Sequence, residues 1–408
     1  MKLYEGKSGK IVYFDGLRGF AALIVVFHHF KNAFYPALYT GREVHVDSRL
    51  MDFINNTPVR LFLSGDVAVC TFFCLSGFVL SNGYFRKQDR LAVVNSAFRR
   101  YFRLTIPILT ASIFSYALLS LDLMQNQVSS RYTGASSFGA FLHINPSFIN
   151  MFTEAVWGVY VKSSKLYNPV LWTMRPELIG SFLVYSFLLL LGKYRVRYIF
   201  YAAFLYLFTV VNVYFTGFFL GMLLSDLSAR GRLEGIVDKA AVTMVLLVSG
   251  ILLGGYQPVT DLLVGNAAVI KLSSKAVGAV IPMAGAFCFL LALLCSGTMK
   301  RVFSSRPMHF LGQISFSLYL THFILQLSLT SSLFNWLYGS VRLSYNESAL
   351  TALALSLPVM LSISYLMYLA VDLQSIRFGK YLWKKVSGMT GHLSAGFVKS
   401  LLLKRAGM

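Results

Sequence analysis

The stretch Leu17–Phe30, LRGFAALIVVFHHF, places a permanent cation and two titratable rings in one hydrophobic segment. Nine uncharged residues follow Arg18 before the histidine pair, and the run predicts a membrane-spanning helix over residues 14–34. Eleven residues at about 100° each bring His29 within about 20° of the direction of Arg18, roughly 16 Å further along the axis, whereas His28 points about 80° away. One helix face therefore carries a cation near one membrane surface and a ring near the other, although anchoring or helix packing explains each residue taken singly.

The composition is that of a polytopic membrane protein. Hydrophobic residues make up 56% of the 408 residues and charged residues only 13%, about half the share that soluble domains carry. A formal net charge of +21 is also typical of nucleic-acid-binding proteins, so the distribution of the basic residues has to decide between the two classes. All four cysteines lie inside apolar runs, which favours buried small hydrophobes over disulfides or metal ligands, and no metal site is expected.

Ten hydrophobic runs are long enough, or nearly long enough, to cross about 30 Å of hydrocarbon, so the sequence predicts an all-α membrane protein. The run RYIFYAAFLYLFTVVNVYFTGFFLGMLL is divided at Asn212 into two short spans, with one long helix as the alternative. The first run is long enough to span the membrane, and no cleavable signal peptide is expected there. The predicted spans are residues 14–34, 61–84, 103–123, 173–192, 196–211, 213–226, 239–255, 276–297, 312–334 and 349–371.

The basic residues support this count and give it an orientation. With both termini cytoplasmic, 25 of the 37 lysines and arginines fall in the cytoplasmic segments. The charge is then explained loop by loop, and nucleic-acid binding is no longer expected. We expect a cytoplasmic segment at 1–13, a transmembrane domain at 14–372 and a basic cytoplasmic tail at 373–408 beside anionic lipids. The membrane would be a bacterial inner membrane or a plasma membrane.

Polar residues inside the second and third spans are candidates for chemistry, because each costs free energy unless it faces protein or water. Asp66 lies near the outer end of the second span, and Ser76 precedes a glycine in FFCLSGFVLS, where helix packing is the stronger interpretation. Arg99, Arg100 and Arg103 crowd the cytoplasmic end of the third span in RRYFRLTIP. Guanidinium groups hold phosphates bidentately, but anchoring at the membrane surface explains these arginines equally well.

The fourth span opens with NPVLWTMRPELIGSFLVY, which holds Trp172, Arg175 and Glu177. An acid in the first helical turn is favoured by the helix dipole, which partly accounts for Glu177. Its predicted depth is comparable to that of His29, and a carboxylate beside an imidazole orients the ring. The ninth span, FLGQISFSLYLTHF, adds a tyrosine and a histidine three residues apart, on roughly one face.

Five blocks in register resemble the acyltransferase family 3 membrane proteins, which O-acylate glycans and other extracytoplasmic acceptors. The spacing of Arg18 and His29 resembles the Arg-x10-His signature of that family, and implies that these two residues are tied to activity. Glu177 matches the family's glutamate after a tryptophan, although Arg175 and Pro176 depart from its common Trp-Ser-Leu-x-x-Glu pattern. The blocks are DGLRGFAALIVVFHH, LSGFVLS, RRYFRLTIP, LWTMRPELIGS and FLGQISFSLYLTHF, and FTGFFLGMLL is also similar to the family's sixth span.

The resemblance implies a membrane O-acyltransferase without the esterase-like domain that many relatives carry. The expected donor is a cytoplasmic acyl-CoA, in the first instance acetyl-CoA, with no other cofactor, and the acceptor is an extracytoplasmic carbohydrate or lipid-linked sugar. His29 would be the general base or would carry the acyl group, while Glu177 would orient it or bind the acceptor. The expected donor-binding residues are Arg18, Arg99, Arg100, Arg103 and Ser76, and the expected acceptor-binding residues are Trp172, Arg175, Asp66, Tyr319 and His322.

Two other classes of protein remain as alternatives. A secondary transporter for an anionic or sugar-like solute would also bury Arg, His and Glu, but transporters show inverted repeats and broken helices that the sequence lacks. A membrane O-acyltransferase of another fold would use a buried histidine without the Arg-x10-His pair. Labelled acetyl-CoA discriminates between enzyme and transporter, because an enzyme leaves label on a glycan or lipid.

Overall fold

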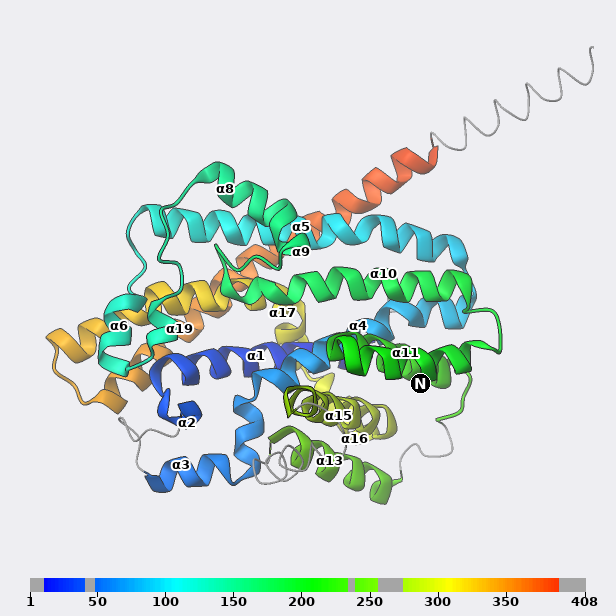
Figure 1. The fold of residues 1–408 in the computed structure, drawn as a ribbon, viewed down its shortest axis with the longest axis horizontal. Helices are drawn as coiled ribbons and strands as arrows, with labels where there is room; N and C mark the ends of the chain where they lie inside the picture. Colours follow the sequence, from blue (N-terminus) through cyan, green and yellow to red (C-terminus); the bar gives the residue numbers. More distant parts are fainter. Residues whose placement is uncertain (1–10, 41–47, 234–238, 256–273, 389–408) are drawn as a thin grey trace, which may run out of the picture.

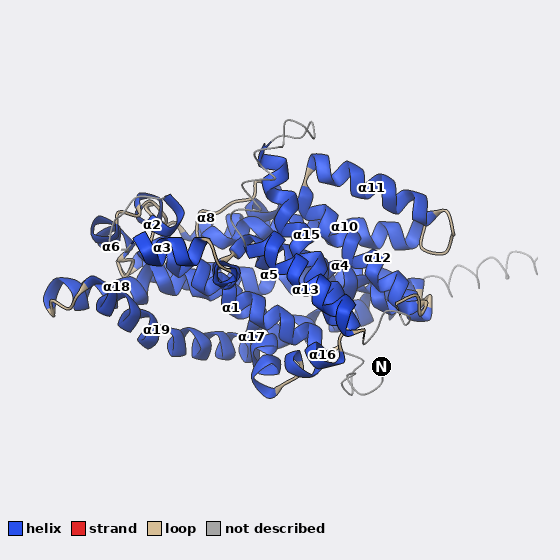
Figure 2. Cartoon of the chain, turned by 90° about the horizontal axis from the view of Figure 1, so that it is seen from below, coloured by secondary structure: helices blue, strands red, loops and turns tan. Residues whose placement is uncertain are grey.

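The computed structural model describes residues 11–40, 48–233, 239–255 and 274–388. Within these ranges the chain forms helices joined by turns and loops, so the predicted all-α fold is confirmed (Figures 1 and 2). A helix overlaps each of the ten predicted spans. These helices are α1 (Val12–Phe34), α4 (Gly65–Lys87), α5 (Arg90–Ser120), α10 (Met174–Leu190), α11 (Arg197–Val211), α12 (Val213–Ala229), α13 (Ala240–Gly255), α15 (Ser274–Cys295), α17 (Arg306–Leu325) and α19 (Tyr345–Met367).

By length and composition, five of the described helical stretches could cross a membrane, and six if one bent pair counts as a single span. This is fewer than ten, because α11, α12 and α13 are only 15, 17 and 16 residues long, and α1 contains Arg18, Lys31 and two histidines. The bent pair consists of Val280–Cys295 and α16 (Gly297–Phe303), which meet at 103°. The five stretches are Gly65–Lys87, Arg90–Ser120, Pro169–Leu190, Arg306–Ser340 and Tyr345–Gly388.

A break at Asn212 separates α11 from α12, as the sequence predicts. Asn212 has an extended backbone (φ −163°, ψ 103°), and its side chain accepts a hydrogen bond from the amide of Tyr214 at 3.1 Å. Asparagine is a favoured helix N-cap because its side chain satisfies one of the orphaned amides of the first turn. The alternative of one continuous helix is therefore wrong.

Glycines allow the central helices to approach closely. A Cβ atom at Gly77 of α4 would overlap the Phe218 carbonyl of α12, and one at Gly221 of α12 would overlap the Cys74 carbonyl of α4. On the other side of the bundle, Gly19 of α1 meets the backbone of α17 at Gly312. Small residues at such crossings are typical of membrane helix packing, which agrees with the packing interpretation of the serine–glycine pair in α4.

The described residues between α1 and α4 and between α5 and α10 form short helices toward one end of the bundle (Figure 1). In α8 and the π-helical turn η3, Phe148, Ile149 and Trp157 are exposed, as in an amphipathic segment at a membrane interface. These elements are α2 (Ala37–Thr40), α3 (Ser48–Asn55), η2 (Pro58–Leu63), α6 (Asn126–Thr133), α7 (Ser136–Gly139), α8 (Phe148–Thr153), η3 (Glu154–Gly158), α9 (Val159–Val161) and η4 (Pro169–Thr173).

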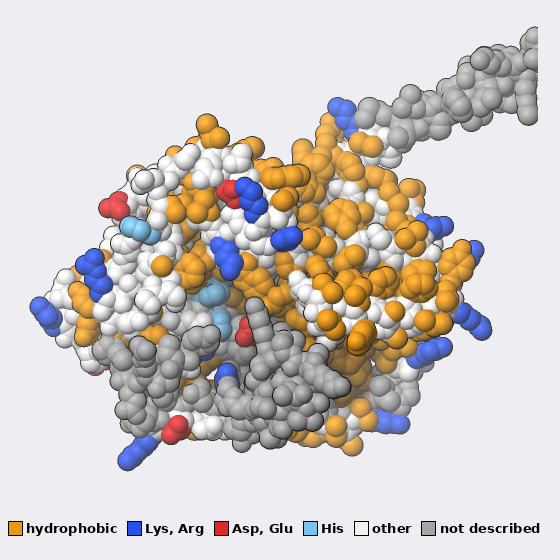
Figure 3. All heavy atoms as spheres, in the orientation of Figure 1, with side chains coloured by type: hydrophobic (Ala, Val, Ile, Leu, Met, Phe, Trp, Pro, Cys, Tyr) orange, Lys and Arg blue, Asp and Glu red, His pale blue; other side chains and the backbone are white. Residues whose placement is uncertain are grey.

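Helix α17 leads into a connection to the last long helix, and much of this connection is buried. After α17 the chain passes through two π-helical turns and a short helix before α19. A further π-helical turn follows α19, and the helix then continues to Gly388. Hydrophobic side chains cover a broad area of the visible surface, and several lysines and arginines gather at its right-hand edge (Figure 3). The connecting elements are η6 (Gln326–Thr330), α18 (Ser331–Asn335), η7 (Trp336–Ser340) and η8 (Tyr368–Asp372).

Candidate active site

A cavity of about 300 Å³ lies among α1, α4, α5, α10, α17 and η8. Its walls combine apolar side chains with several charged groups, a mixture that a largely apolar bundle holds only where a polar ligand or water is accommodated. The polar side chains that line it are Asp15, Arg18, Ser76, Arg100, Arg103, Thr173, Glu177, His309, Gln313, Ser315, Tyr319, Tyr368 and Asp372.

Arg18 contributes to this cavity from the first turns of α1. Its guanidinium forms an ion pair with Asp15 at 3.2 Å, one turn earlier on the same helix. Both side chains are about one quarter exposed, so water and ligands can reach them. Arg18 is therefore placed to contact an anion in the cavity while Asp15 holds its position.

The carboxylate of Glu177 binds Arg100 and Ser76, so its role toward His29 or the acceptor stays a prediction. It forms a short ion pair with Arg100 of α5, and Ser76 of α4 donates a hydrogen bond to the same carboxylate oxygen at 2.8 Å. The Arg100 Nε donates to Ser181 at 2.8 Å, one turn further along α10. A carboxylate and a guanidinium that are both almost buried compensate each other, so this network fixes α4, α5 and α10 around the cavity.

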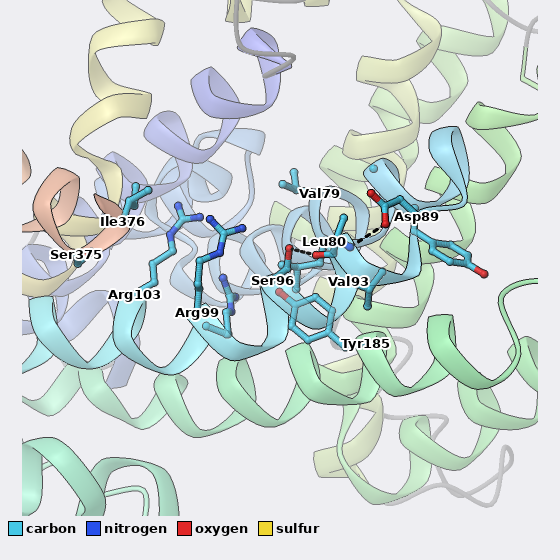
Figure 4. Close-up of a pocket in the computed structure, with 14 residues that line it drawn as sticks. Val79, Leu80, Asp89, Val93, Ser96, Arg99, Arg103, Tyr185, Ser375 and Ile376 are labelled. Carbon is cyan, nitrogen blue, oxygen red and sulfur yellow. Dashed lines mark hydrogen bonds between the residues drawn. The ribbon is translucent and has the colours of Figure 1, made fainter. Parts of the chain in front are cut away.

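A second cavity, of about 260 Å³, adjoins the first, because Arg100 and Arg103 line both. In Figure 4 the Arg99 and Arg103 side chains extend from α5 into the same space, with Asp89 and Ser96 further along it. Arg103 also interacts electrostatically with Asp372 of η8, which lines the larger cavity. The three arginines predicted to bind the donor are thus brought together, with Arg18 in the adjoining cavity.

His29 lies beside a second imidazole. The ring centroids of His29 on α1 and His322 on α17 are 5.3 Å apart, and His29 also contacts Phe323 at 4.5 Å. Neither histidine lines either cavity, but Tyr319 lines the larger one and its ring centroid lies 6.0 Å from that of His322. The imidazole pair therefore lies one helical turn beyond the end of the arginine-lined cavity.

His28 has the contacts of a structural histidine. Its Nδ1 donates to the Leu63 carbonyl at 2.9 Å, and its Nε2 accepts from Asn32 at 3.0 Å. Both ring nitrogens are satisfied, and a carbonyl can only accept, so the ring is a neutral Nδ1–H tautomer. The choice of His29 over His28 from helix periodicity is consistent with this geometry.

The residues predicted to bind the acceptor are not gathered in one place. Tyr319 lines the larger cavity, with its hydroxyl donating to the Val170 carbonyl at 2.9 Å. Trp172 instead contacts Tyr214 of α12 with 5.3 Å between ring centroids, Arg175 is exposed on α10, and Asp66 is exposed at the start of α4. Trp172, Arg175 and Asp66 do not line either cavity.

Several residues of the site were not predicted from the sequence. Asp15 could have been found as the i−3 partner of Arg18, and Ser181 as the i+4 neighbour of Glu177. Gln313 lies inside a block already recognised as family-like, whereas Asp372 comes from a π-helical turn within the distant helical stretch Tyr345–Gly388 and carries no local signal. Among the described residues, no three His, Cys, Asp or Glu side chains are grouped to hold a metal ion.

Comparison with known proteins identifies the family. The family model described as the acyltransferase domain of family 3 matches residues 11–369, and the chain therefore belongs to this family. The predicted resemblance is confirmed, and the protein is an integral membrane acyltransferase rather than a transporter.

Two fungal proteins are distant relatives along most of their length. Acyltransferase R4 of a Phoma species is 23% identical over 405 residues, covering 80% of this chain and 85% of the relative. O-acetyltransferase PaAT-1 of Phomopsis amygdali is 24% identical over 427 residues, covering 92% of this chain and 84% of the relative. No solved structure matches the chain.

Proposed function

We propose that the protein transfers an acyl group, with acetyl as the first choice, from cytoplasmic acyl-CoA to a hydroxyl group of an extracytoplasmic carbohydrate or lipid-linked acceptor. The observation that carries the proposal is the pair of adjoining cavities, which run from Arg99, Arg100 and Arg103 past Arg18 to Tyr319, one turn from the His29–His322 pair. The name of the Phomopsis relative, an O-acetyltransferase, supports the choice of acetyl and of oxygen.

The arginines would bind the phosphate groups of the donor. Arg99 and Arg103 lie in the smaller cavity together with Ser96, and Arg103 continues into the larger one. Guanidinium groups are well suited to phosphate because they offer a planar fork of donors that stays charged. The acyl end of the donor would then point along α17 toward His29.

His29 would act as the general base. Its lone pair would take the proton of the acceptor hydroxyl while the oxygen attacks the thioester carbonyl carbon. The carbon–oxygen bond forms, the carbon–sulfur bond breaks, and CoA leaves as a thiolate that receives the proton from His29. Transfer through an acyl group carried on His29 is the covalent variant of the same chemistry.

This proposal includes a topology of ten spans with both termini cytoplasmic. Basic turns such as 86–90 and 193–197 would then face the cytoplasm at the same end as the arginine-lined cavity. The short helices between residues 124 and 172 would lie at the outer surface. A donor entering from the cytoplasm would meet an acceptor arriving from outside near the imidazole pair.

Separate measurements of binding and transfer test the proposal. We expect Arg103→Ala to weaken acetyl-CoA binding to the detergent-solubilised protein by at least tenfold, measured by titration calorimetry. His29→Ala should leave acetyl-CoA binding unchanged but lower the rate of transfer by about 10²–10⁴-fold. The rate is measured as the release of CoA thiol and as the label moved from [14C]acetyl-CoA to glycan and lipid extracts of membranes.

His28→Asn is the matched control for His29→Ala, because the amide retains a donor for the Leu63 carbonyl. This variant should bind and transfer like the unsubstituted protein. Unchanged transfer by both Arg18→Ala and His29→Ala would overturn the proposed function.

A further inference from the structure

We infer that His322 is a positioning residue for His29, and that the two imidazoles act as one proton-holding unit. The inference rests on the proposed function, in which His29 takes the proton of the acceptor hydroxyl. The sequence predicts that His322 binds the acceptor. The inference instead assigns His322 to the proton transfer from the acceptor hydroxyl.

The buried environment of His322 fixes its protonation pattern. The side chain is fully buried, and its Nδ1 lies 2.9 Å from the Leu318 carbonyl one turn earlier on α17. A carbonyl oxygen only accepts hydrogen bonds, so Nδ1 carries the proton and Nε2 carries a lone pair. That Nε2 has no hydrogen-bond partner among the described residues. Buried polar atoms are rarely left in this state unless they have a functional partner.

His29 is the group that can use this lone pair. The two ring centroids are 5.3 Å apart, and the planes are inclined by 38°. At this separation, a small rotation of the rings or one bridging water brings an N–H of His29 into hydrogen-bond range of Nε2. At Nε2, His322 can only accept a hydrogen bond, so His29 must direct its N–H toward His322. The other nitrogen of His29, which carries the lone pair, then faces the hydroxyl group of the acyl acceptor.

No acid competes for the role of orienting His29 in the described part of the chain. Glu177 is engaged by Arg100 and Ser76. From α1, His28 and Lys31 interact with His29, and from α17, Tyr319 adjoins His322. Asp66 at the start of α4 interacts with His28 and Lys31. We therefore assign the neutral imidazole of His322 as the side-chain acceptor for the proton-bearing nitrogen of His29.

The proton balance of the reaction follows from this arrangement. When the acceptor oxygen attacks the thioester carbon, its proton moves to the free nitrogen of His29, and the carbon–sulfur bond breaks. His29 is then an imidazolium whose other N–H is held by the His322 lone pair, so the two rings share one positive charge. The proton returns from His29 to the departing thiolate, which leaves free CoA, the acylated acceptor and both imidazoles neutral.

Substitution of His322 by asparagine or by glutamine tests the functions of its two ring nitrogens separately. Asparagine retains a donor where Nδ1 bonds to Leu318 but has nothing at the Nε2 position, whereas glutamine retains an acceptor near Nε2. We expect His322→Asn to lower kcat by about 10–100-fold with unchanged KM for acetyl-CoA and unchanged Tm. His322→Gln should retain most of kcat. In His322→Asn, the acidic limb of the pH profile of kcat/KM should also move, because His29 loses its partner.

Wild-type kcat and an unshifted pH profile in His322→Asn would overturn the inference, as would equal losses in both variants. His28→Asn serves again as the control for a neighbouring histidine. If His29→Ala is inactive while His322→Asn is fully active, this inference fails and the proposed function stands. If His29→Ala is itself fully active, the proposed function fails.

A spectroscopic test avoids the substitution of His322 altogether. NMR of the 15N-labelled histidines should report a hydrogen-bonded Nε2 on His322 in the unsubstituted protein and the loss of this bond in His29→Phe. An identical Nε2 resonance in both proteins would contradict the pairing, even if neither variant at position 322 folds.

Discussion

The Arg100–Glu177 pair shows how one contact serves both the stability and the chemistry of the site. Glu177 neutralises a guanidinium that lines both cavities, and Ser76 and Ser181 satisfy further polar atoms of the pair. Removing one partner of a buried ion pair leaves an uncompensated charge, whereas removing both together is far better tolerated.

We expect Arg100→Met and Glu177→Met each to destabilise the protein by about 3–5 kcal/mol, because the remaining partner is left unpaired. The double variant Arg100→Met/Glu177→Met should recover most of the lost stability but not the binding of acetyl-CoA. Thermal unfolding in detergent and the donor titration measure the two effects. Single variants with unchanged Tm would show that the pair is not a buried ion pair in solution.

A matched control for this cycle is the pair of Arg197 and Asp226, which lines neither cavity. Arg197 binds the carboxylate through two nitrogens, at 2.7 and 3.0 Å, and both side chains are fully buried. Its guanidinium also lies 4.9 Å from the Tyr198 ring centroid. Arg230 also pairs with Asp226, at 2.9 Å. Because neither Arg197 nor Asp226 lines a cavity, Arg197→Met/Asp226→Leu should retain acetyl-CoA binding.

Helix periodicity predicted the relation of Arg18 to His29 because both lie on one helix with a fixed angle per residue. It could not predict the partner of Glu177, since depth in the membrane gives the height of a side chain but not the direction in which its helix faces. His322 lies on a helix that the sequence predicts. Its contact with His29 could not be predicted, because it depends on how α1 and α17 pack.

At the scale of elements, α4 and α17 meet where Phe72 and Tyr319 line the larger cavity. The rings of Phe72 and Tyr319 meet edge to face, with 5.9 Å between centroids, and Tyr319 is fixed by its hydrogen bond to Val170. An acyl group longer than acetyl would have to displace Phe72, the less constrained of the two rings. The contact between the two helices is therefore expected to set the length of the acyl group.

We expect Phe72→Ala to raise the rate with butyryl-CoA relative to acetyl-CoA by at least tenfold, because each methylene rejected by an apolar pocket corresponds to roughly 10–200-fold in specificity. Competition between the two donors in one reaction measures this ratio. Val79→Ala is the control, since Val79 lies about two helical turns away on α4 and also lines the smaller cavity. An unchanged ratio in Phe72→Ala would show that another contact limits acyl length.

Local sequence signals predicted most of the helices, but they did not predict where the helices bend. Asn212 carries its own capping signal, so the division between α11 and α12 followed from the sequence. The 103° bend before α16 occurs at Ser296, whose side chain accepts from Met299, and hydropathy measures only the length of an apolar run. The π-helical turn that brings Asp372 to the cavity is likewise determined by packing.

At the scale of the whole molecule, the distribution of charge predicts which end of the bundle faces the cytoplasm. Arg86, Lys87 and Arg90 surround the turn between α4 and α5, close to the smaller cavity. The short helices α6, α7 and α8 lie toward the opposite end of the long axis in Figure 1. Composition alone indicated the membrane class, whereas the cavities depend on residues from helices that are far apart in the sequence.

Cysteine labelling on intact cells tests this orientation. In a protein with its four native cysteines replaced, Ser137→Cys on α7 should react with a membrane-impermeant maleimide. Gln88→Cys, at the turn between α4 and α5, should react only after permeabilisation. Both positions are exposed, so accessibility within the protein does not limit the reaction. Labelling of Gln88→Cys on intact cells with protection of Ser137→Cys would reverse the proposed topology.

The ion pair between α11 and α12 has a consequence for biogenesis. The two helices are 15 and 17 residues long, below the roughly 20 residues that cross a bilayer unaided, and each contributes one fully buried charge. Neither helix can enter the lipid alone without exposing an unpaired arginine or aspartate. We therefore expect the translocation machinery to release α11 and α12 together as a hairpin closed at Asn212, after the second of the two has been synthesised.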